Sequence, residues 1–455
     1  MDKGARRAGG PGRSTGEVYM RMKLMAGAAI ALVLASPAFA NSSSITQNQA
    51  DHTAIVDQTG GNAGSSNITQ NGNDNFANVD QSDSASSGNP ARNASTINQN
   101  GNSNDADVEQ ISTGAGVATQ NTSVIVQTGG DAVASVYQEG VGNSSTIDQY
   151  AADSESATVK QVGTGNVSDV EQSGTGGTVL VDQGYTGGNS NDSIANVDQN
   201  GTNGTITIDQ SGDSQMASVS QGGSNNIMSV EQIGQNNILS ALQTGSSSVI
   251  TVDQIGSGLG NFVDITQSGS GATFYASQTG SGNEVDFNQL ANTSSATFVQ
   301  SGNGNSASGS QMGSGNLIDI SQANSGNDAD VSQDGTSNRT YVTQTAGPNS
   351  ATIGQGGTSN DIWLTQAGSL NAANLIQSGT GNDLFVDQSG AENTVVVNQS
   401  GNAGMIDIDQ ATAGAYAEVN QSGGSGNFAS ISQLSLDAVG IITQAGANNF
   451  ASIKQ

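Results

Sequence analysis

Glutamine is the residue whose chemistry and spacing stand out in this chain. From Gln267 to Gln421 a glutamine falls every 11 residues, fifteen in succession. The same register runs from Gln47 to Gln455 and contains 36 glutamines, and 28 of their 35 intervals are 11 residues long. A carboxamide is not an acid, a base or a nucleophile, but it both donates and accepts hydrogen bonds. A short fixed period of this kind predicts a stacked repeat and not a globular core.

The unit between successive glutamines has the pattern Q-x-G-x-x-N-x-Φ-x-Φ-x-Q, where Φ is mostly aliphatic. In the unit from Gln311 to Gln322, Asn316, Ile318 and Ile320 alternate with residues of the opposite face. Alternation with period two is typical of a half-buried strand. The four residues after each glutamine are rich in Gly, Ser, Thr and Asn and predict a turn.

The glutamines and asparagines fall on the inward face of these strands. A buried carboxamide without a partner costs about 1–3 kcal/mol. Stacking equivalent units about 4.8 Å apart would let each amide donate to the same residue in the next layer. The predicted ladder residues of the regular region are Gln267, Gln278, Gln289, Gln300, Gln311, Gln322, Gln333, Gln344, Gln355, Gln366, Gln377, Gln388, Gln399, Gln410, Gln421, Asn316, Asn338, Asn360 and Asn382.

These units predict an all-β solenoid over residues 41–455. An 11-residue strand and turn is half of a coil, so two units, about 22 residues, form a layer of two facing strands. Thirty-six strands make 18 layers, or roughly 85 Å of stacked β-structure. The four longest intervals predict looped-out turns near residues 82–92, 111–120, 184–192 and 255–260.

Residues 1–40 have the pattern of a secretory signal peptide. Arg21 and Lys23 precede an apolar run, Leu24–Leu34, and an A-x-A cleavage site ends at Ala40. Residues 1–19 are consistent with an over-long gene call, because Met20 or Met22 would make a conventional translation start. No other segment is apolar enough to span a membrane. The mature chain would hold 37 acidic and four basic residues and no cysteine, which disfavours nucleic acid and anionic lipid as partners.

The remaining candidate residues predict surface features and no catalytic, cofactor or metal site. His52, the one histidine, falls in an inward Asn position, where we expect it to replace an asparagine. Asp209, Glu231 and Asp253 are 22 residues apart and should form an acidic stack, either a solvated face that limits aggregation or a stripe that is bridged by cations or sensitive to acid. Tyr341, Trp363 and Phe385 have the same spacing and should form an exposed aromatic stack that stiffens the solenoid or serves as a contact patch.

The repeat resembles the curlin repeat of curli, the bacterial functional amyloid. The stretch from Gln70 through Gly72, Asn75 and Val79 to Gln81 is similar to that motif almost letter for letter, and residues 99–110 follow it too. The resemblance covers residues 41–455 and implies secretion through an outer-membrane pore, assembly with a related nucleator subunit and adhesive, biofilm-building fibres on a Gram-negative-type bacterium. The chain has several-fold more repeats than a curli subunit, and its first strand follows directly after the signal peptide.

The sequence therefore predicts a secreted structural subunit that assembles with itself. We expect the mature chain, which would begin near Asn41, to start and end on ladder strands without a capping element, and solenoids that stay monomeric need polar caps. The alternative is a monomeric or surface-tethered rod that acts as an adhesin or fibre nucleator without polymerising. An enzyme is the weakest of the three hypotheses, because no clustered acid and base interrupt the repeat.

Overall fold

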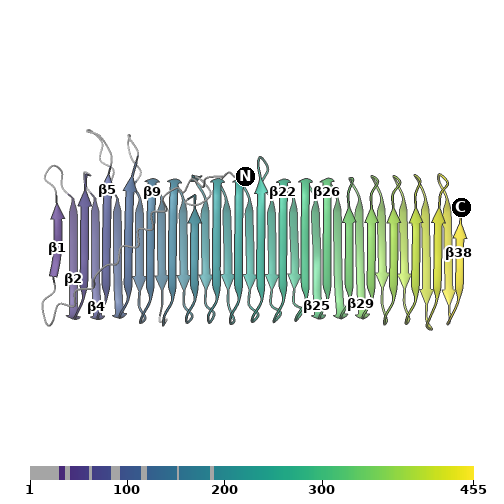
Figure 1. The fold of residues 1–455 in the computed structure, drawn as a ribbon, viewed down its shortest axis with the longest axis horizontal. Coiled ribbons are helices and arrows are strands. Elements are labelled where there is room, and N and C mark those ends of the chain that lie inside the picture. Colours follow the sequence, from purple (N-terminus) through teal and green to yellow (C-terminus); the bar gives the residue numbers. More distant parts are fainter. Residues whose placement is uncertain are drawn as a thin grey trace, which may run out of the picture.

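The computed structural model describes residues 30–35, 41–60, 64–83, 93–113, 120–150, 153–184 and 189–455. These residues contain 38 strands and no helix. The strands lie side by side across the long axis of the molecule, as Figure 1 shows. The predicted all-β solenoid of stacked two-stranded coils is confirmed.

The strands form two parallel sheets that face each other. Each strand between the ends pairs with strands of the preceding and following coils, so consecutive strands belong to alternate sheets, except that β13 (Thr178–Gln183) and β14 (Ser190–Asn191) lie in the same sheet. Sheet B contains β2 (Ser42–Ala50), β4 (Ser65–Asn73), β6 (Ala94–Asn102), β8 (Thr122–Gln127), β10 (Ser144–Gln149), β12 (Val167–Gln172), β15 (Ile194–Gln199), β17 (Met216–Gln221), β19 (Ile238–Gln243), β21 (Phe262–Gln267), β23 (Glu284–Gln289), β25 (Ser306–Ser314), β27 (Asp328–Thr336), β29 (Ser350–Thr358), β31 (Ala372–Gln377), β33 (Thr394–Gln399), β35 (Tyr416–Ser422) and β37 (Val439–Ala445).

Sheet A holds the partner strand of every coil and two additional strands, β1 and β14. Its members are β1 (Ile30–Ala35), β3 (Thr53–Thr59), β5 (Phe76–Asp83), β7 (Asp105–Ser112), β9 (Val133–Val141), β11 (Ser156–Thr164), β13 (Thr178–Gln183), β14 (Ser190–Asn191), β16 (Thr205–Asp213), β18 (Ile227–Gln235), β20 (Val249–Gly256), β22 (Thr273–Ser281), β24 (Ser295–Asn303), β26 (Leu317–Ser325), β28 (Arg339–Gln344), β30 (Asp361–Gln366), β32 (Asp383–Gln388), β34 (Met405–Gln410), β36 (Phe428–Gln433) and β38 (Phe450–Lys454).

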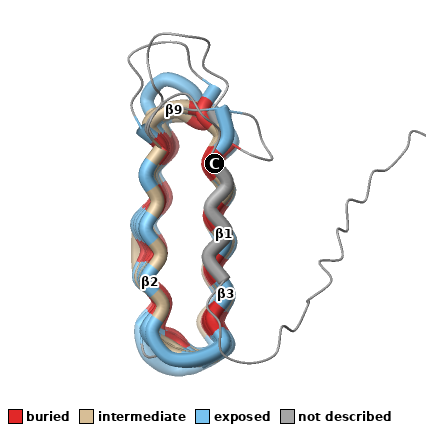
Figure 2. Tube along the Cα trace, turned by 90° about the vertical axis from the view of Figure 1, so that its left-hand side faces the viewer, coloured by how far each residue is buried: buried red, intermediate tan, exposed pale blue. Residues whose placement is uncertain are grey.

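The core is a narrow layer between the two sheets. Figure 2 looks along the solenoid axis and shows buried residues on the inner side of both strands. Ile318 and Ile320 of β26 are 0% exposed, whereas their neighbours Leu317, Asp319 and Ser321 are half-buried. Parallel pairing keeps one register throughout, so that Gln322 lies opposite Gln300 on one side and Gln344 on the other.

Three of the predicted looped-out turns and the signal peptide lie largely outside the described residues. Within the predicted turn at 184–192, Ser190–Asn191 forms the short strand β14, which pairs with β11 and β16. The fourth predicted turn follows β20, where the chain bends before β21. From the predicted signal peptide, β1 pairs in parallel with β3, Ile30 opposite Thr53 and Ala35 opposite Gln58.

Candidate functional site

The glutamine side chains form continuous hydrogen-bonded columns along the solenoid axis. From Gln267 to Gln421, each Nε2 donates to Oε1 of the glutamine one coil later, at 2.7–3.1 Å. From Gln58 to Gln444 every ladder glutamine is 0–5% exposed. All of these bonds run in the same direction, from an earlier coil to a later one, so the column has a chemical polarity.

Most of the glutamine amides also tie the two sheets together. Gln322 of β26 donates a second hydrogen bond to the Ser306 carbonyl of β25 at 2.7 Å, and Gln388 of β32 donates likewise to Ala372 of β31 at 3.2 Å. A primary amide has two donor hydrogens, and this geometry gives a partner to each. The free-energy cost of burying these amides is therefore offset by hydrogen bonds along the axis and across the coil.

Asparagine forms part of the expected amide-to-amide ladder, as between Asn360 Nδ2 and Asn338 Oδ1 at 3.3 Å, and also bonds to the backbone. The Oδ1 of Asn338 accepts the backbone N–H of Asn360 at 3.0 Å, and the Oδ1 of Asn360 accepts that of Asn382 at 3.0 Å. The Nδ2 of Asn382 instead donates to turn carbonyls, those of Ser378 at 2.7 Å and Gly401 at 3.0 Å. Asparagine is one methylene shorter than glutamine, so its amide reaches the adjacent turn and fixes it.

The glycine two positions after glutamine is required by the stacking of turns. Gly379 has a φ of +102°, a region that L-residues with side chains rarely adopt. A Cβ at Gly379 would lie 1.9 Å from the carbonyl oxygen of Gly401, the equivalent glycine one coil later. The Q-x-G-x-x-N pattern therefore encodes a turn whose backbone packs directly on the next turn.

Two inward positions hold an ionisable residue where most coils have asparagine. His52 is 8% exposed, its Nδ1 lies 3.4 Å from the backbone N of Asn75 and its Nε2 lies 2.8 Å from the Asn48 carbonyl. Those are the contacts of an asparagine in this slot. Glu155, which sequence reasoning missed, is 1% exposed, and its Oε2 has no hydrogen-bond partner among the described residues. Burial raises the pKa of Glu155 to about 7.

The structure places the predicted acidic stack in adjacent coils of sheet A. Asp209 of β16 lies opposite Glu231 of β18, and Glu231 lies opposite Asp253 of β20. The carboxylate of Asp253 accepts a hydrogen bond from the Tyr275 hydroxyl at 3.2 Å. These residues are half-buried or exposed on the outer face of the sheet.

A second acidic stack, which sequence reasoning missed, contains Asp57, Asp80 and Glu109. Burial raises the pKa of Asp80, and the Asp57 and Asp107 carboxylates raise it further. Burial also raises the pKa of Glu109, with further contributions from Asp80 and other acids. The three residues are 23 and 29 positions apart, because an insertion separates the last two, so a search at a spacing of 22 does not find them.

The predicted aromatic stack lies on the outer face of sheet A. The rings of Tyr341 and Trp363 have centroids 5.8 Å apart and planes 8° apart, and those of Trp363 and Phe385 are 4.6 Å and 3° apart. All three side chains are half-buried. Sequence reasoning missed a second aromatic group, Phe274, Phe287 and Phe298, which packs inside the core.

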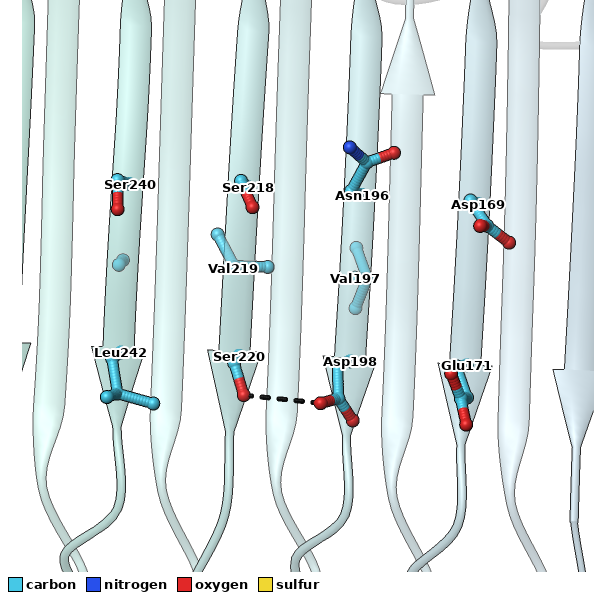
Figure 3. A pocket seen from close by; sticks show the side chains of 11 residues that line it. Asp169, Glu171, Asn196, Val197, Asp198, Ser218, Val219, Ser220, Ser240 and Leu242 are labelled. Carbon is cyan, nitrogen blue, oxygen red and sulfur yellow. Dashed lines mark hydrogen bonds between the residues drawn. The ribbon is translucent and has the colours of Figure 1, made fainter.

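The outer face of sheet B has a shallow hollow over β12, β15, β17 and β19. Its floor is formed by Asn196, Ser218 and Ser240, with Asp198 hydrogen-bonded to Ser220 at 3.5 Å (Figure 3). Its carboxylates belong to successive coils and face outward. Among the residues that the structure describes, no three His, Cys, Asp or Glu side chains are grouped to hold a metal ion. No described helix is long and apolar enough to cross a membrane.

Comparison with known families identifies the repeat. The model of the curlin associated repeat matches residues 201–234, 325–357 and 357–390. These three segments of the chain contain curlin associated repeats. The predicted family is confirmed, and the curlin register continues through about eighteen coils, since the glutamine column joins each coil to the next. No curated protein matches the chain.

Proposed function

We propose that this curlin-repeat protein is a secreted structural subunit that assembles into curli-type amyloid fibres for surface adhesion and biofilm matrix. The observation that carries the proposal is the uniformity of the contact between coils. Every coil presents the same strand register and the same one-way glutamine bonds to its neighbour, as in Gln300–Gln322 and Gln322–Gln344. A coil from a second copy can therefore be bound by the interactions that already join coils within one chain.

The curlin family supports the other parts of the proposal. Curlin repeats belong to extracellular fibres of bacteria, so we infer an extracellular location, export through an outer-membrane pore and a related nucleator subunit as partner. The repeats are structural, and the described surface is dominated by stacked, repeated side chains. This favours a fibre subunit over an enzyme.

The proposal predicts filaments from the chain that begins at Asn41. Residues 41–455 diluted from denaturant at neutral pH should form unbranched filaments with a cross-β reflection near 4.7–4.8 Å. Ile320→Lys is a suitable control, because it buries a charge at a position that is 0% exposed and should prevent the coil from forming. A wild-type chain that stays monomeric by light scattering for days would contradict self-assembly and favour the monomeric rod.

A further inference from the structure

The first strand of sheet A comes from the predicted signal peptide. Residues 30–35 form β1, which pairs in parallel with β3 in a register that places Ala35 opposite Gln58. The separation of 23 residues equals that between β3 and β5, where Gln58 lies opposite Gln81. β1 therefore occupies the place in sheet A that one further coil would take, although it contains no ladder glutamine.

Pairing with β1 satisfies one edge of β3 through the backbone. The N–H of Thr53 donates to the carbonyl of Asn75, directly before β5, at 2.9 Å. Along a parallel strand successive N–H groups point to opposite sides, so the N–H groups of Ala54, Val56 and Gln58 face β1. Without β1 these three donors would form an open strand edge, and such an edge is a template for pairing with another chain.

The glutamine column adds a preference for a strand from a second copy. Gln58 Nε2 donates to Gln81 Oε1 at 2.7 Å, in the same direction as the bonds of the later coils. The Oε1 of Gln58 is therefore oriented to accept an amide from a preceding coil, but Ala35 of β1 has no amide to donate. A sheet A strand of a second copy, with glutamine in this register, would pair with the backbone of β3 and also continue the column.

We propose that this edge of β3 is a surface on which a second copy docks, and that β1 closes the surface until residues 1–40 are removed. The inference rests on the proposed function, because the partner is another subunit of the same fibre. β1 has the advantage while it is attached, since a tethered segment acts at a high effective concentration. Each coil contributes a strand to each sheet, so closing β3 prevents a complete coil from being added at this end. Removal of the predicted signal peptide thus permits assembly.

Hydrogen–deuterium exchange of dilute monomers tests whether β1 closes the edge. The amides of Ala54, Val56 and Gln58 should exchange about ten-fold or more slowly in the full chain than in the mature chain that begins at Asn41. The matched variant of the full chain is Leu32→Pro/Leu34→Pro, which keeps the segment apolar but places two residues in β1 that cannot donate to a strand ladder. This variant should exchange like the mature chain. Equal exchange in the full and mature chains would overturn the proposal.

Elongation of preformed filaments tests whether the closed edge prevents docking. Fragmented filaments of the mature chain, incubated with full-chain monomer, should lengthen at less than about a tenth of the rate that mature monomer supports. Full-chain monomer that carries Leu32→Pro/Leu34→Pro should restore the rate to within about two-fold of the mature chain. Elongation by the wild-type full chain at the mature rate, with its β3 amides protected from exchange, would overturn the proposal. A mature chain that forms no filaments would overturn the proposed function, and with it the docking of a second copy, whatever the exchange of β3 shows.

Discussion

Replacing Glu155 by glutamine should make the coils around β11 more stable at alkaline pH and remove much of their pH dependence. Glu155 occupies an inward slot between Ala132 and Gly177 of the adjacent coils, neither of which has a polar side chain to bond with it. Its side chain is 1% exposed. Burial raises the pKa of Glu155 from 4.5 to about 7, and a hydrogen bond from the Gly174 backbone offsets only part of that effect.

The sign of the effect follows from the raised pKa. The protonated carboxyl favours the folded state, so this stabilisation is fully present below pH 4.5 and is lost as the pH rises through about 7. At 1.36 kcal/mol per pKa unit, ionised Glu155 costs about 3 kcal/mol at pH 8 and less than about 1 kcal/mol at pH 5. The difference between those pH values, about 2–3 kcal/mol, should disappear in Glu155→Gln.

Hydrogen–deuterium exchange can measure this difference locally. The ratio of wild-type to variant exchange rates in β9, β11 and β13 should be larger at pH 8 than at pH 5 by about two orders of magnitude. Any cost in stability of burying the new glutamine amide does not depend on pH, so it cancels in this comparison. Comparing the proteins at the same pH cancels the intrinsic exchange rate. Glu171→Gln, at an exposed position of β12, is the control and should give ratios near one. The reasoning is wrong if the Glu155→Gln ratio is the same at both pH values.

Two further predictions concern the ladder and the acidic surface. Gln322→Ala should remove the hydrogen bonds to Gln300, Gln344 and Ser306 and destabilise the neighbouring coils by at least about 1–3 kcal/mol. The control variant Ser321→Ala should leave the stability nearly unchanged. Equal resistance of both variants to unfolding by urea would show that the glutamine column contributes little to stability. Burial and nearby carboxylates raise the pKa of Asp80 and Glu109, so protonation of these two side chains stabilises the fold as the pH falls. Protonation removes the repulsion between these carboxylates, and salt screens it. Assembly should therefore accelerate from pH 7 to pH 4 and on addition of salt. Lag times measured by light scattering should respond less to pH in Asp80→Asn/Glu109→Gln, and an identical response in the variant would contradict a role for this stack.

The fold could be predicted from the sequence because one physical requirement repeats in every unit. Alternation assigns a face to each residue, as at Ile318 and Ile320, and the spacing of the glutamines fixes which residues meet one coil apart. Residues in a column, such as Tyr341 and Trp363, could be paired for the same reason. The near-parallel orientation of the two ring planes could not be predicted, because it depends on side-chain torsions that the spacing does not specify.

Other features escaped prediction because they depend on reach or on interruptions of the period. The amide of Asn382 bonds to turn carbonyls, and the equivalent position one coil later is Gly404, whose backbone N–H donates to Asn382 Oδ1. The stack of Asp57, Asp80 and Glu109 is hidden by an insertion. Glu155 was visible in principle, since an acid six residues before a ladder glutamine falls in an inward slot. The pairing of β1 with β3 has no counterpart in the repeat.

The buried amides explain how a chain of near-identical coils keeps a single register. Aliphatic residues alone would tolerate a slip of two residues along a strand, because Ile318 would still meet an apolar neighbour after such a shift. A slip of two would, however, place Gln322 opposite Phe298 or Gly302, neither of which has a side-chain amide, and leave the Gln322 amide without its partners at 2.8 and 2.9 Å. The cost of an unpaired buried amide, about 1–3 kcal/mol, would be incurred in every displaced coil. Because the same column would continue across a junction between two copies, the residues that align coils within the chain would also align one subunit on the next.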